Sequence, residues 1–341
     1  MGKSKKNGSK KIDWDRIQLR SRRRVTGGVV SHEHPAWAPD GRHLAFYAGV
    51  YGAIDIVVTD RRGRFAAVVA DGPGNKTQAC WHPDGHRIAY RWQQGNDKPW
   101  EIWEVEVLGG PSTAKKLLGD GKHSFKHPSY SPDGRFVAYF SDEGSPANFH
   151  LFLLDVITQA RRQLTFDAHR NDCHPSWSAD GLELAFHAYE GSENATESNI
   201  YTLLVDSGQV EKVSPGGHLD KHPFFVDGRF LVFHREDPEG DRGIVLHDRV
   251  TGREKVLTDL DENCKHPHPF VTRRRNVRLA YATKERGDEL EGEDKRYDIV
   301  VARLDGLRVA KPKKRAHSED EVARGDADET LPPTAEGGAS A

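Results

Sequence analysis

Several features that would assign this chain of 341 residues to a familiar class are scarce or missing. No apolar run approaches the length of a membrane span, and charged residues make up 30% of the chain, so we expect a soluble protein with no membrane partner. The basic start, residues 1–11, has no apolar stretch behind it, which argues against a secretory signal and favours a cytoplasmic location. Only three cysteines are present (Cys80, Cys173 and Cys264), and an odd number fits a reducing compartment.

Other absences narrow the function. The net charge of −2 argues against a general nucleic-acid binder, so we expect no nucleic-acid partner. The chain contains no Gly-x-Ser-x-Gly nucleophile elbow, no glycine-rich phosphate loop and no paired Cys-x-x-Cys zinc motif. Serine hydrolases, nucleotide-binding enzymes and zinc-ribbon proteins are therefore disfavoured.

What the chain does contain is a repeat. The motif reads HPAWAPDG at 34–41, QACWHPDG at 78–85, HPSYSPDG at 127–134 and HPSWSADG at 174–181, with divergent copies HPFFVDG at 222–228 and HPHPF at 266–270. The first positions are 44, 49, 47, 48 and 44 residues apart, which is the length of one four-stranded propeller blade.

Each copy predicts the same succession of strands. An aromatic strand ends in a tight Asp-Gly turn, and a second strand with alternating apolar residues follows, such as HLAFY at 43–47. A third strand carries an Ile/Leu-Val-Asp pattern and a fourth is more polar, as in ARRQLT at 160–165. We therefore predict an all-β, six-bladed β-propeller of four-stranded antiparallel blades.

The two ends of the chain differ from the repeats between them. The last copy lacks a fourth strand, and residues 17–26 resemble the fourth strands elsewhere, so we expect this N-terminal strand to complete the last blade and close the ring. The propeller is then expected over residues 14–310. Residues 1–13 form a basic segment and residues 311–341 a charged tail almost without large apolar side chains, and both are predicted to be disordered.

The repeat string HPxWSPDGxxxAF resembles the WD40-like (PD40) repeat of TolB-like β-propellers, and the resemblance covers most of residues 14–305. It implies the fold and is nearly silent on function, because propellers host binding proteins and enzymes alike.

The first residue of each repeat opens the strand that lines the central channel of a propeller. These positions hold five histidines and one glutamine: His34, Gln78, His127, His174, His222 and His266. His268 follows two residues after His266, and alternation along a strand would turn both toward the channel. One interpretation is that His-Pro is a favoured way to begin this strand and recurs because the repeat recurs. The other is that a subset of this histidine ring binds a divalent metal ion such as Mn²⁺, Fe²⁺, Zn²⁺ or Ni²⁺.

A second set of positions is expected on the same face, at the ends of the second strands. The aligned residues are Tyr47, Arg91, Phe140, His187, His234 and Ala282. Arg91, His187 and His234 are polar groups that can move protons or bind anions. Lys126, Lys221 and Lys265 each precede a ring histidine, and alternation predicts that they turn away from the channel.

A second resemblance concerns the segment NCKHPHPF at 263–270. It is similar to the metal-site segment of oligogalacturonate lyases, where a Gln-x-x-His-x-His run and a histidine two blades earlier hold Mn²⁺. By this resemblance His266, His268 and His174 are metal ligands, and Asn263 stands where the family has glutamine.

The resemblance implies a metal-dependent lyase that cleaves short acidic oligosaccharides by β-elimination. The metal draws charge from a uronate carboxylate, and His234, His187 or an unprotonated Arg91 removes the C5 proton. The alternative is a non-catalytic TolB-like propeller that binds a protein or peptide on its top face.

Overall fold

The computed structural model describes residues 12–28, 30–50, 53–145, 147–191, 195–284, 296–307 and 309. The segments predicted to be disordered, 1–13 and 311–341, lie outside these ranges apart from Ile12 and Asp13. Within the described ranges no helix is long and apolar enough to cross a bilayer. The helical elements there are single turns of 3-10 helix, namely η1 (Trp14–Arg16), η2 (Gly110–Thr113) and η3 (Leu260–Glu262).

The other regular elements of the described chain are β-strands in mainly antiparallel sheets, as the repeat predicted. Three four-stranded sheets follow the chain in order: β10 (Phe125–Tyr130), β11 (Phe136–Ser141), β12 (His150–Asp155) and β13 (Arg161–Gln163); β14 (Arg170–Trp177), β15 (Glu183–Glu190), β16 (Asn199–Leu204) and β17 (Val210–Lys212); β18 (Leu219–Phe225), β19 (Phe230–Glu236), β20 (Arg242–Asp248) and β21 (Glu254–Val256). In each of them the strand that opens the repeat stands at one edge.

A larger sheet precedes these three. It has eight strands: β2 (Ser31–Trp37), β3 (His43–Val50), β4 (Ala53–Asp60), β5 (Ala66–Ala70), β6 (Gly74–Trp81), β7 (Arg87–Gln93), β8 (Glu101–Glu106) and β9 (Lys115–Leu118). Two antiparallel sets, β2–β5 and β6–β9, share one strand pairing among the described residues, a short parallel contact of β4 with β6 at Ala53↔Gly74 and Ile54↔Asn75.

The last sheet combines both ends of the described chain. Its order is β1 (Gln18–Arg24), β24 (Tyr297–Asp305), β23 (Val277–Lys284) and β22 (Lys265–Val271). β1 pairs antiparallel with β24, from Gln18↔Asp305 to Arg24↔Val300, as the similarity of residues 17–26 to other fourth strands predicted. Trp14 and Ile17 anchor this strand, because both are buried in the core cluster between the last two sheets.

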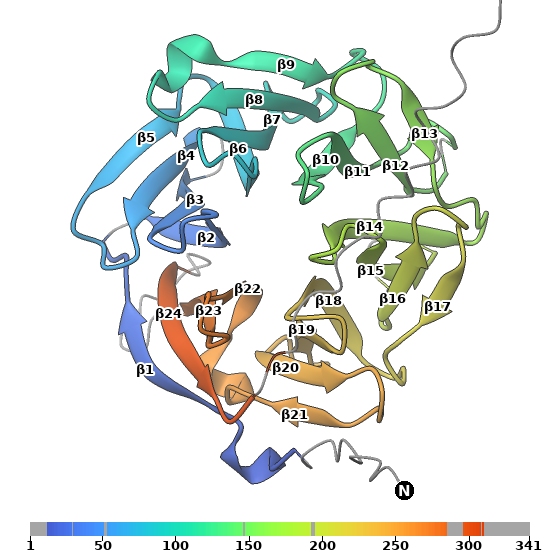
Figure 1. Cartoon of the computed structure of the whole chain (residues 1–341). Helices are drawn as coiled ribbons and strands as arrows, with labels where there is room; N and C mark the ends of the chain where they lie inside the picture. The colour runs from blue at the N-terminus through green and yellow to red at the C-terminus, as the bar shows by residue number, and fades with distance from the viewer. Residues whose placement is uncertain are drawn as a thin grey trace, which may run out of the picture.

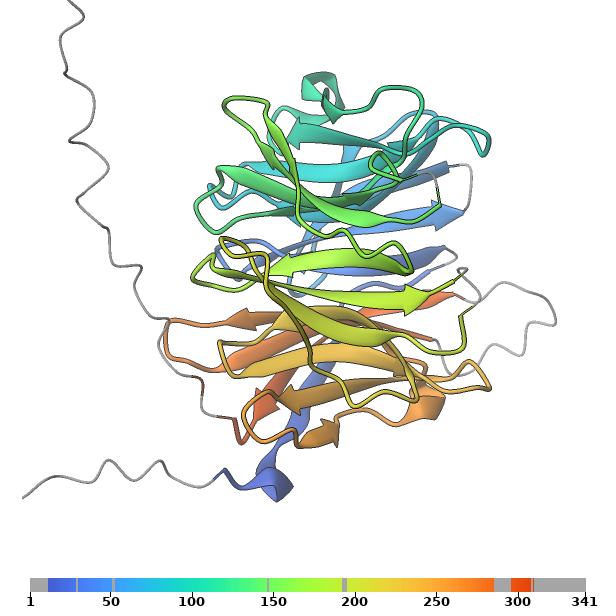
Figure 2. The ribbon, with the colours of Figure 1, turned by 90° about the vertical axis from the view of Figure 1, so that its right-hand side faces the viewer.

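The sheets are arranged radially in a propeller-like fold. Figure 1 looks along the central channel, with β2, β6, β10, β14, β18 and β22 around it, and Figure 2 shows the same ring from the side. The first and last sheets meet: Lys265 Nζ lies 2.6 Å from Glu33 Oε2, and Arg278 Nη1 donates to the Gly41 carbonyl oxygen over 3.2 Å. Gly41 has a positive φ of 62°, and a Cβ there would lie 2.2 Å from the Phe270 ring, so this turn requires glycine.

Candidate metal centre in the central channel

The six ring positions share an unusual backbone conformation. Each has a positive φ between 50° and 56°, although none is glycine: His34, Gln78, His127, His174, His222 and His266. At each of them the pairing between the first and second strand shifts register, for example between Cys173 and Ser176. A bulge of this kind bends the strand and re-aims a side chain, here toward the channel. Six strained residues at equivalent positions indicate a conformation that the surrounding strands impose.

The five imidazoles form one compact cluster. Ring centroids lie 3.4 Å apart for His34 and His266, 3.9 Å for His174 and His222, and 4.5 Å for His127 and His174. His222 also lies 4.5 Å from His266 and 4.9 Å from His34. The histidine ring expected from the repeat is therefore a packed group in which each member contacts others across the channel.

The protonation state of this cluster follows from its burial. Loss of hydration lowers the pKa of His34, His174, His222 and His266 well below 6.5, and neighbouring imidazoles and cations lower it further. Burial lowers the pKa of His127 to about 3. The rings are therefore neutral at pH 7, which is the form that binds metal ions.

Several nitrogen atoms of the cluster make no hydrogen bond within the described ranges. The Nδ1 atoms of His127, His174, His222 and His266 are buried and make no hydrogen bond within the described part of the chain. The Nε2 atom of His174 lies 3.0 Å from the Gln78 amide nitrogen. Because an unpaired buried polar atom costs about 1–3 kcal/mol, four of them in one cluster indicate a site built to receive a ligand.

Among the described residues, two sets of side chains have ligand atoms within 4.8 Å of one another. One set is His34, His222 and His266, and the other is Cys173, His174 and His187. Three imidazoles are a common ligand set for a divalent ion with an open position. The donor chemistry and the unpaired Nδ1 atoms of His222 and His266 thus fit the metal expected from the sequence.

The ligand set inferred from the resemblance is not brought together. His174 and His266 belong to different sets, and His268 belongs to neither. The Trp37 backbone N–H donates to His268 Nδ1 over 3.5 Å, and the imidazole packs on Phe224 at 4.6 Å. The bulge at His266 is the reason, because the positive φ breaks the alternation that would have turned both histidines the same way.

Asn263 is also engaged elsewhere. It ends η3 in a left-handed conformation, with φ at 50°. Its Oδ1 accepts hydrogen bonds from Arg242 Nη1 and the Tyr297 hydroxyl, each over 3.2 Å, and its Nδ2 donates to Asp241 over 2.9 Å. The side chain that would replace the family's glutamine thus holds the loop before β22.

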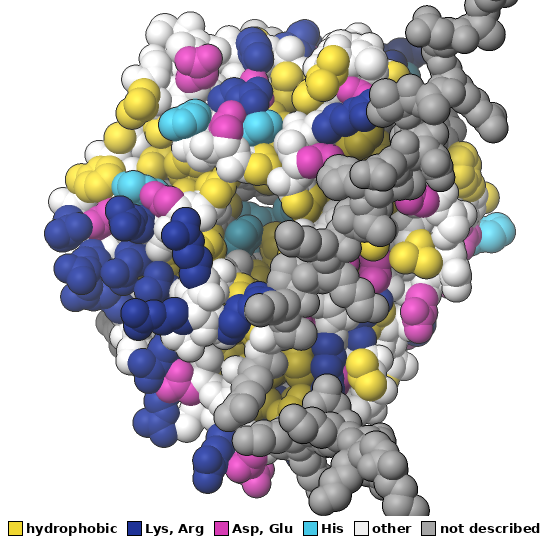
Figure 3. All heavy atoms as spheres, viewed as in Figure 1, with side chains coloured by type: hydrophobic (Ala, Val, Ile, Leu, Met, Phe, Trp, Pro, Cys, Tyr) yellow, Lys and Arg dark blue, Asp and Glu magenta, His cyan; other side chains and the backbone are white. Residues whose placement is uncertain are grey.

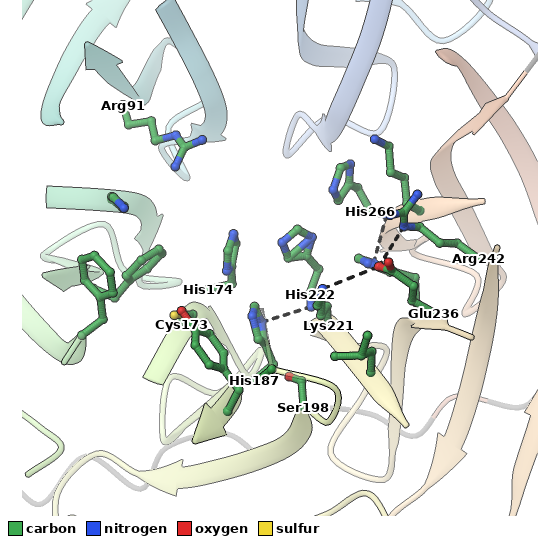
Figure 4. A pocket seen from close by; sticks show the side chains of 18 residues that line it. Arg91, Cys173, His174, His187, Ser198, Lys221, His222, Glu236, Arg242 and His266 are labelled. Carbon is green, nitrogen blue, oxygen red and sulfur yellow. Dashed lines mark hydrogen bonds and ion pairs between the residues drawn. The ribbon is translucent and has the colours of Figure 1, made fainter. Parts of the chain in front are cut away.

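The second-strand positions are equivalent, as predicted. Each pairs with the residue just before a ring position, as in Thr77↔Arg91, Cys173↔His187 and Lys221↔His234. Arg91, His187 and His234 line the same cavity of about 340 Å³ as His174, His222 and His266. Figure 4 shows Arg91 and His187 pointing into this cavity together with ring histidines.

The contacts of these three residues limit their chemistry. Arg91 donates from Nε to the Thr77 hydroxyl over 2.6 Å, and its guanidinium lies 4.0 Å from the centre of the Trp100 ring. His187 Nδ1 accepts from the His222 backbone N–H over 3.3 Å, and His234 Nδ1 accepts from the His266 N–H over 3.4 Å. A neutral imidazole that accepts at Nδ1 carries its proton on Nε2, so both histidines present a donor there.

The cavity is strongly basic, which sequence reasoning missed. Its lining includes five cationic side chains and one carboxylate, namely Arg91, Lys126, Lys221, Arg242, Lys265 and Glu236. Lys126, Lys221 and Lys265 were predicted to turn away from the channel, and this prediction is wrong because the bulge after each of them reverses the expected direction. Glu236 lies 3.5 Å from Lys221 and 3.0 Å from Arg242, so the carboxylate offsets only part of the charge.

A second cavity of about 390 Å³ lies on the other side of the ring and shares His222 and His266 with the first. Its lining combines aromatic residues and prolines, such as Trp37, Trp81 and Phe224, with the ring positions His34, Gln78 and His127. His268 belongs to this apolar side. Figure 3 shows a hollow at the centre of one face of the molecule, with histidine side chains in its depth.

The fold and the histidine-centred channel define a propeller-like protein whose inner strands carry the candidate site. Residues 104–271 match the family model described as the TolB beta propeller domain, PD40. The resemblance inferred from the repeat is thereby confirmed.

Solved structures agree on the fold. The chain is similar to TolB from Acinetobacter baumannii, with 16% identity, a TM-score of 0.54 and coverage of 80% of this chain and 63% of that one. For a putative TolB from Agrobacterium tumefaciens the identity is 20%, the TM-score 0.57 and the coverage 72% and 89%. An oligogalacturonate lyase in complex with manganese shares 15% identity at a TM-score of 0.54, with 86% of this chain and 96% of that chain covered.

Proposed function

We propose that this protein is a cytoplasmic, metal-dependent lyase that cleaves short uronate oligosaccharides by β-elimination in the basic cavity. The observation that carries the proposal is the group of three neutral imidazoles, those of His34, His222 and His266, of which His222 and His266 also line the cavity that holds five cations. Neutral imidazoles suit a divalent metal, and the cations suit a polyanionic substrate. The likeness to a manganese-containing oligogalacturonate lyase supports the substrate class.

The proposed architecture is a closed ring of six blades. In this interpretation the eight-stranded sheet counts as two blades, β2–β5 and β6–β9, since only two residue pairs join them. The pairing of β1 with β24 supplies the outer strand of the last blade and closes the ring.

His34, His222 and His266 would hold the ion, with Mn²⁺ favoured by resemblance and Fe²⁺, Ni²⁺ or Zn²⁺ compatible with the ligand type. When bound, a divalent ion supplies Lewis acidity that draws charge from a uronate carboxylate. Lys221, Lys265 and Arg242 are paired with Glu236 and Glu33, and they would exchange these partners for the remaining carboxylates of the oligosaccharide.

The roles of the polar groups follow from their contacts. His187 and His234 present Nε2–H toward the cavity, so they bind substrate oxygens as hydrogen-bond donors and are unsuited as bases in this tautomer. This leaves Arg91 as the base of the three candidates. The base takes the C5 proton, the C4–O4 bond breaks with its electron pair on oxygen, and a C4=C5 double bond forms while the departing oxygen takes a proton from water.

We expect oligogalacturonate and Mn²⁺ to give an unsaturated product that can be followed by its ultraviolet absorbance. Because a general base contributes about 10²–10⁴-fold, Arg91→Ala should lower kcat by at least about 10²-fold with a smaller change in KM. A guanidinium gives up its proton only at high pH, so the rate should rise with pH through the alkaline range.

Arg135, which is paired with Asp155 on the surface, provides the control, and Arg135→Ala should retain full activity. A rate that is already constant at neutral pH would assign the base to a histidine instead, because burial lowers the pKa of His187 and His234 well below 6.5. Absence of product with every metal and uronate tested would contradict the lyase proposal.

The alternative, a non-catalytic module that binds a protein or peptide, is favoured by the apolar second cavity and its aromatic lining. In that case, peptides selected from a random library should bind the wild-type protein and lose affinity for Phe224→Ala. The same peptides should bind Arg91→Ala unchanged, because Arg91 lines the first cavity and not the second.

A further inference from the structure

Cys173, His174 and His187 form a second group of potential ligands in the basic cavity. Their Sγ and ring nitrogen atoms lie within 4.8 Å of one another. All three residues line the first cavity, and Figure 4 shows them side by side.

The local structure explains why these three side chains meet. Cys173 on β14 and His187 on β15 are directly opposed in the strand pairing, which brings their side chains to the same face of the sheet. His174 follows in the left-handed conformation, with φ at 56°, and the bulge turns its imidazole back toward the same cavity. In the other sheets the position of Cys173 is held by Glu33, Thr77, Lys126, Lys221 and Lys265, so the thiol belongs to this repeat only.

A second observation points to a ligand at this group. The His174 Nδ1 atom is buried and makes no hydrogen bond within the described residues, and burial keeps the pKa of His174 well below 6.5. Gln78 contacts the other ring nitrogen, so the imidazole is held while Nδ1 has no acceptor or donor of its own. An oriented neutral imidazole beside a thiol supplies two of the donor atoms that a zinc ion binds.

We propose that Cys173, His174 and His187 form a second metal site, one that takes Zn²⁺ and is distinct from the His34–His222–His266 site. A thiolate is a soft ligand that selects zinc over manganese, and three sulfur and nitrogen ligands with one open position are the arrangement of catalytic zinc sites. Binding releases the Cys173 thiol proton to water, and His187 gives up its long 3.3 Å contact with the His222 N–H if it binds through Nδ1. A water molecule or a substrate oxygen in the cavity completes the coordination.

The site does not depend on the lyase activity. The two groups are adjacent, since the rings of His174 and His222 lie 3.9 Å apart. The full-length protein should therefore bind two neighbouring divalent ions, one of them with sulfur coordination.

Cobalt(II) is the probe, because a Co²⁺–thiolate bond gives a near-ultraviolet charge-transfer band that imidazole ligands lack. Titration of metal-depleted, reduced protein with Co²⁺ should give this band, and Cys173→Ser should abolish it while lowering the affinity for one equivalent by at least about 100-fold. Cys80→Ser and Cys264→Ser, which change the other two thiols, should keep it.

His34→Ala separates the two sites. It should remove one equivalent of Co²⁺ and leave the charge-transfer band, because His34 belongs only to the first group. Absence of the band in the wild-type protein, or a band unchanged in Cys173→Ser, would overturn the second site while leaving the first one and the lyase proposal intact.

A measurement on the wild-type protein covers the case in which Cys173→Ser does not fold. Zn²⁺ should slow the alkylation of Cys173 by at least about tenfold, as read by peptide mass spectrometry. The more exposed Cys80 serves as the internal reference, with no change expected. Equal alkylation of Cys173 with and without Zn²⁺ would also overturn the site.

Discussion

His266→Ala is expected to weaken Mn²⁺ binding by at least about 100-fold, whereas His268→Ala should leave it unchanged, although the two residues stand only two positions apart. His266 belongs to the three-imidazole group, and its Nδ1 is buried and makes no hydrogen bond among the described residues, with Glu33 Oε2 3.8 Å away. His268 packs on the apolar side of the ring. Loss of even an outer partner of a ligand costs 10–100-fold in metal affinity, so loss of one of three ligands should cost more.

The measurement is the electron paramagnetic resonance signal of free Mn²⁺ during titration of metal-depleted protein. His127→Ala is the matched control, because His127 has the same left-handed backbone and lies in the cluster but in neither ligand group. Equal loss of Mn²⁺ binding in His268→Ala would show that His268 is a ligand and would contradict the group His34, His222 and His266. Equal loss in His127→Ala would point to general damage to the ring.

Acidification below about pH 6.5 is expected to unfold the metal-free protein over a narrow pH range. Burial lowers the pKa of eight channel histidines, namely His34, His127, His174, His187, His222, His234, His266 and His268. In the unfolded chain each would titrate near 6.5. Between that value and its folded pKa, the unfolded state therefore binds a proton that the native state does not, and stability is lost as the pH falls.

The expected size is large. Each such histidine contributes ~1.4 kcal/mol per pH unit once the unfolded form is protonated, and eight together approach ~11 kcal/mol per pH unit. This is comparable to the whole stability of a typical domain, about 5–15 kcal/mol. The carboxylates of Asp84 and Asp120, whose pKa values are lowered to about 2 by hydrogen bonds and neighbouring cations, act only at lower pH.

Two measurements on chelator-treated protein test this expectation: the melting temperature and the proton uptake on unfolding. Both are followed from about pH 8 to about pH 5, which covers the pH range in which an unperturbed histidine gains its proton. His127→Gln should reduce the uptake by about one proton, since Gln78 already places an amide at an equivalent ring position. A melting temperature that stays constant across this range would mean that the channel histidines are hydrated or protonated in the native state.

The repeat was sufficient to predict the elements and the ring positions. Asp-Gly turns and alternating apolar residues are local signals, and they predicted the strands from β2 to β23. They also predicted that the residues paired with Thr77, Cys173 and Lys221 occupy equivalent positions. The similarity of residues 17–26 to the fourth strands likewise predicted the pairing of β1 with β24.

The same reasoning did not predict the direction in which the side chains at and beside the ring positions point. Alternation predicts that Lys265 and His266 point to opposite faces and that His266 and His268 point to the same one. The positive φ at His266 reverses this outcome, so that Lys265 lines the basic cavity and His268 the apolar one. A left-handed histidine before proline carries no signal in the residue types themselves.

The grouping of ligands depended on tertiary structure alone. By itself the sequence determined an all-β repeat protein with histidines at the openings of its inner strands. Which of them share a metal site depends on distances across the channel between residues from different sheets, such as His34 on β2 and His222 on β18. Local patterns specify strands and turns because neighbouring residues interact through the backbone. The meeting of side chains at the channel is decided by how the sheets pack around it.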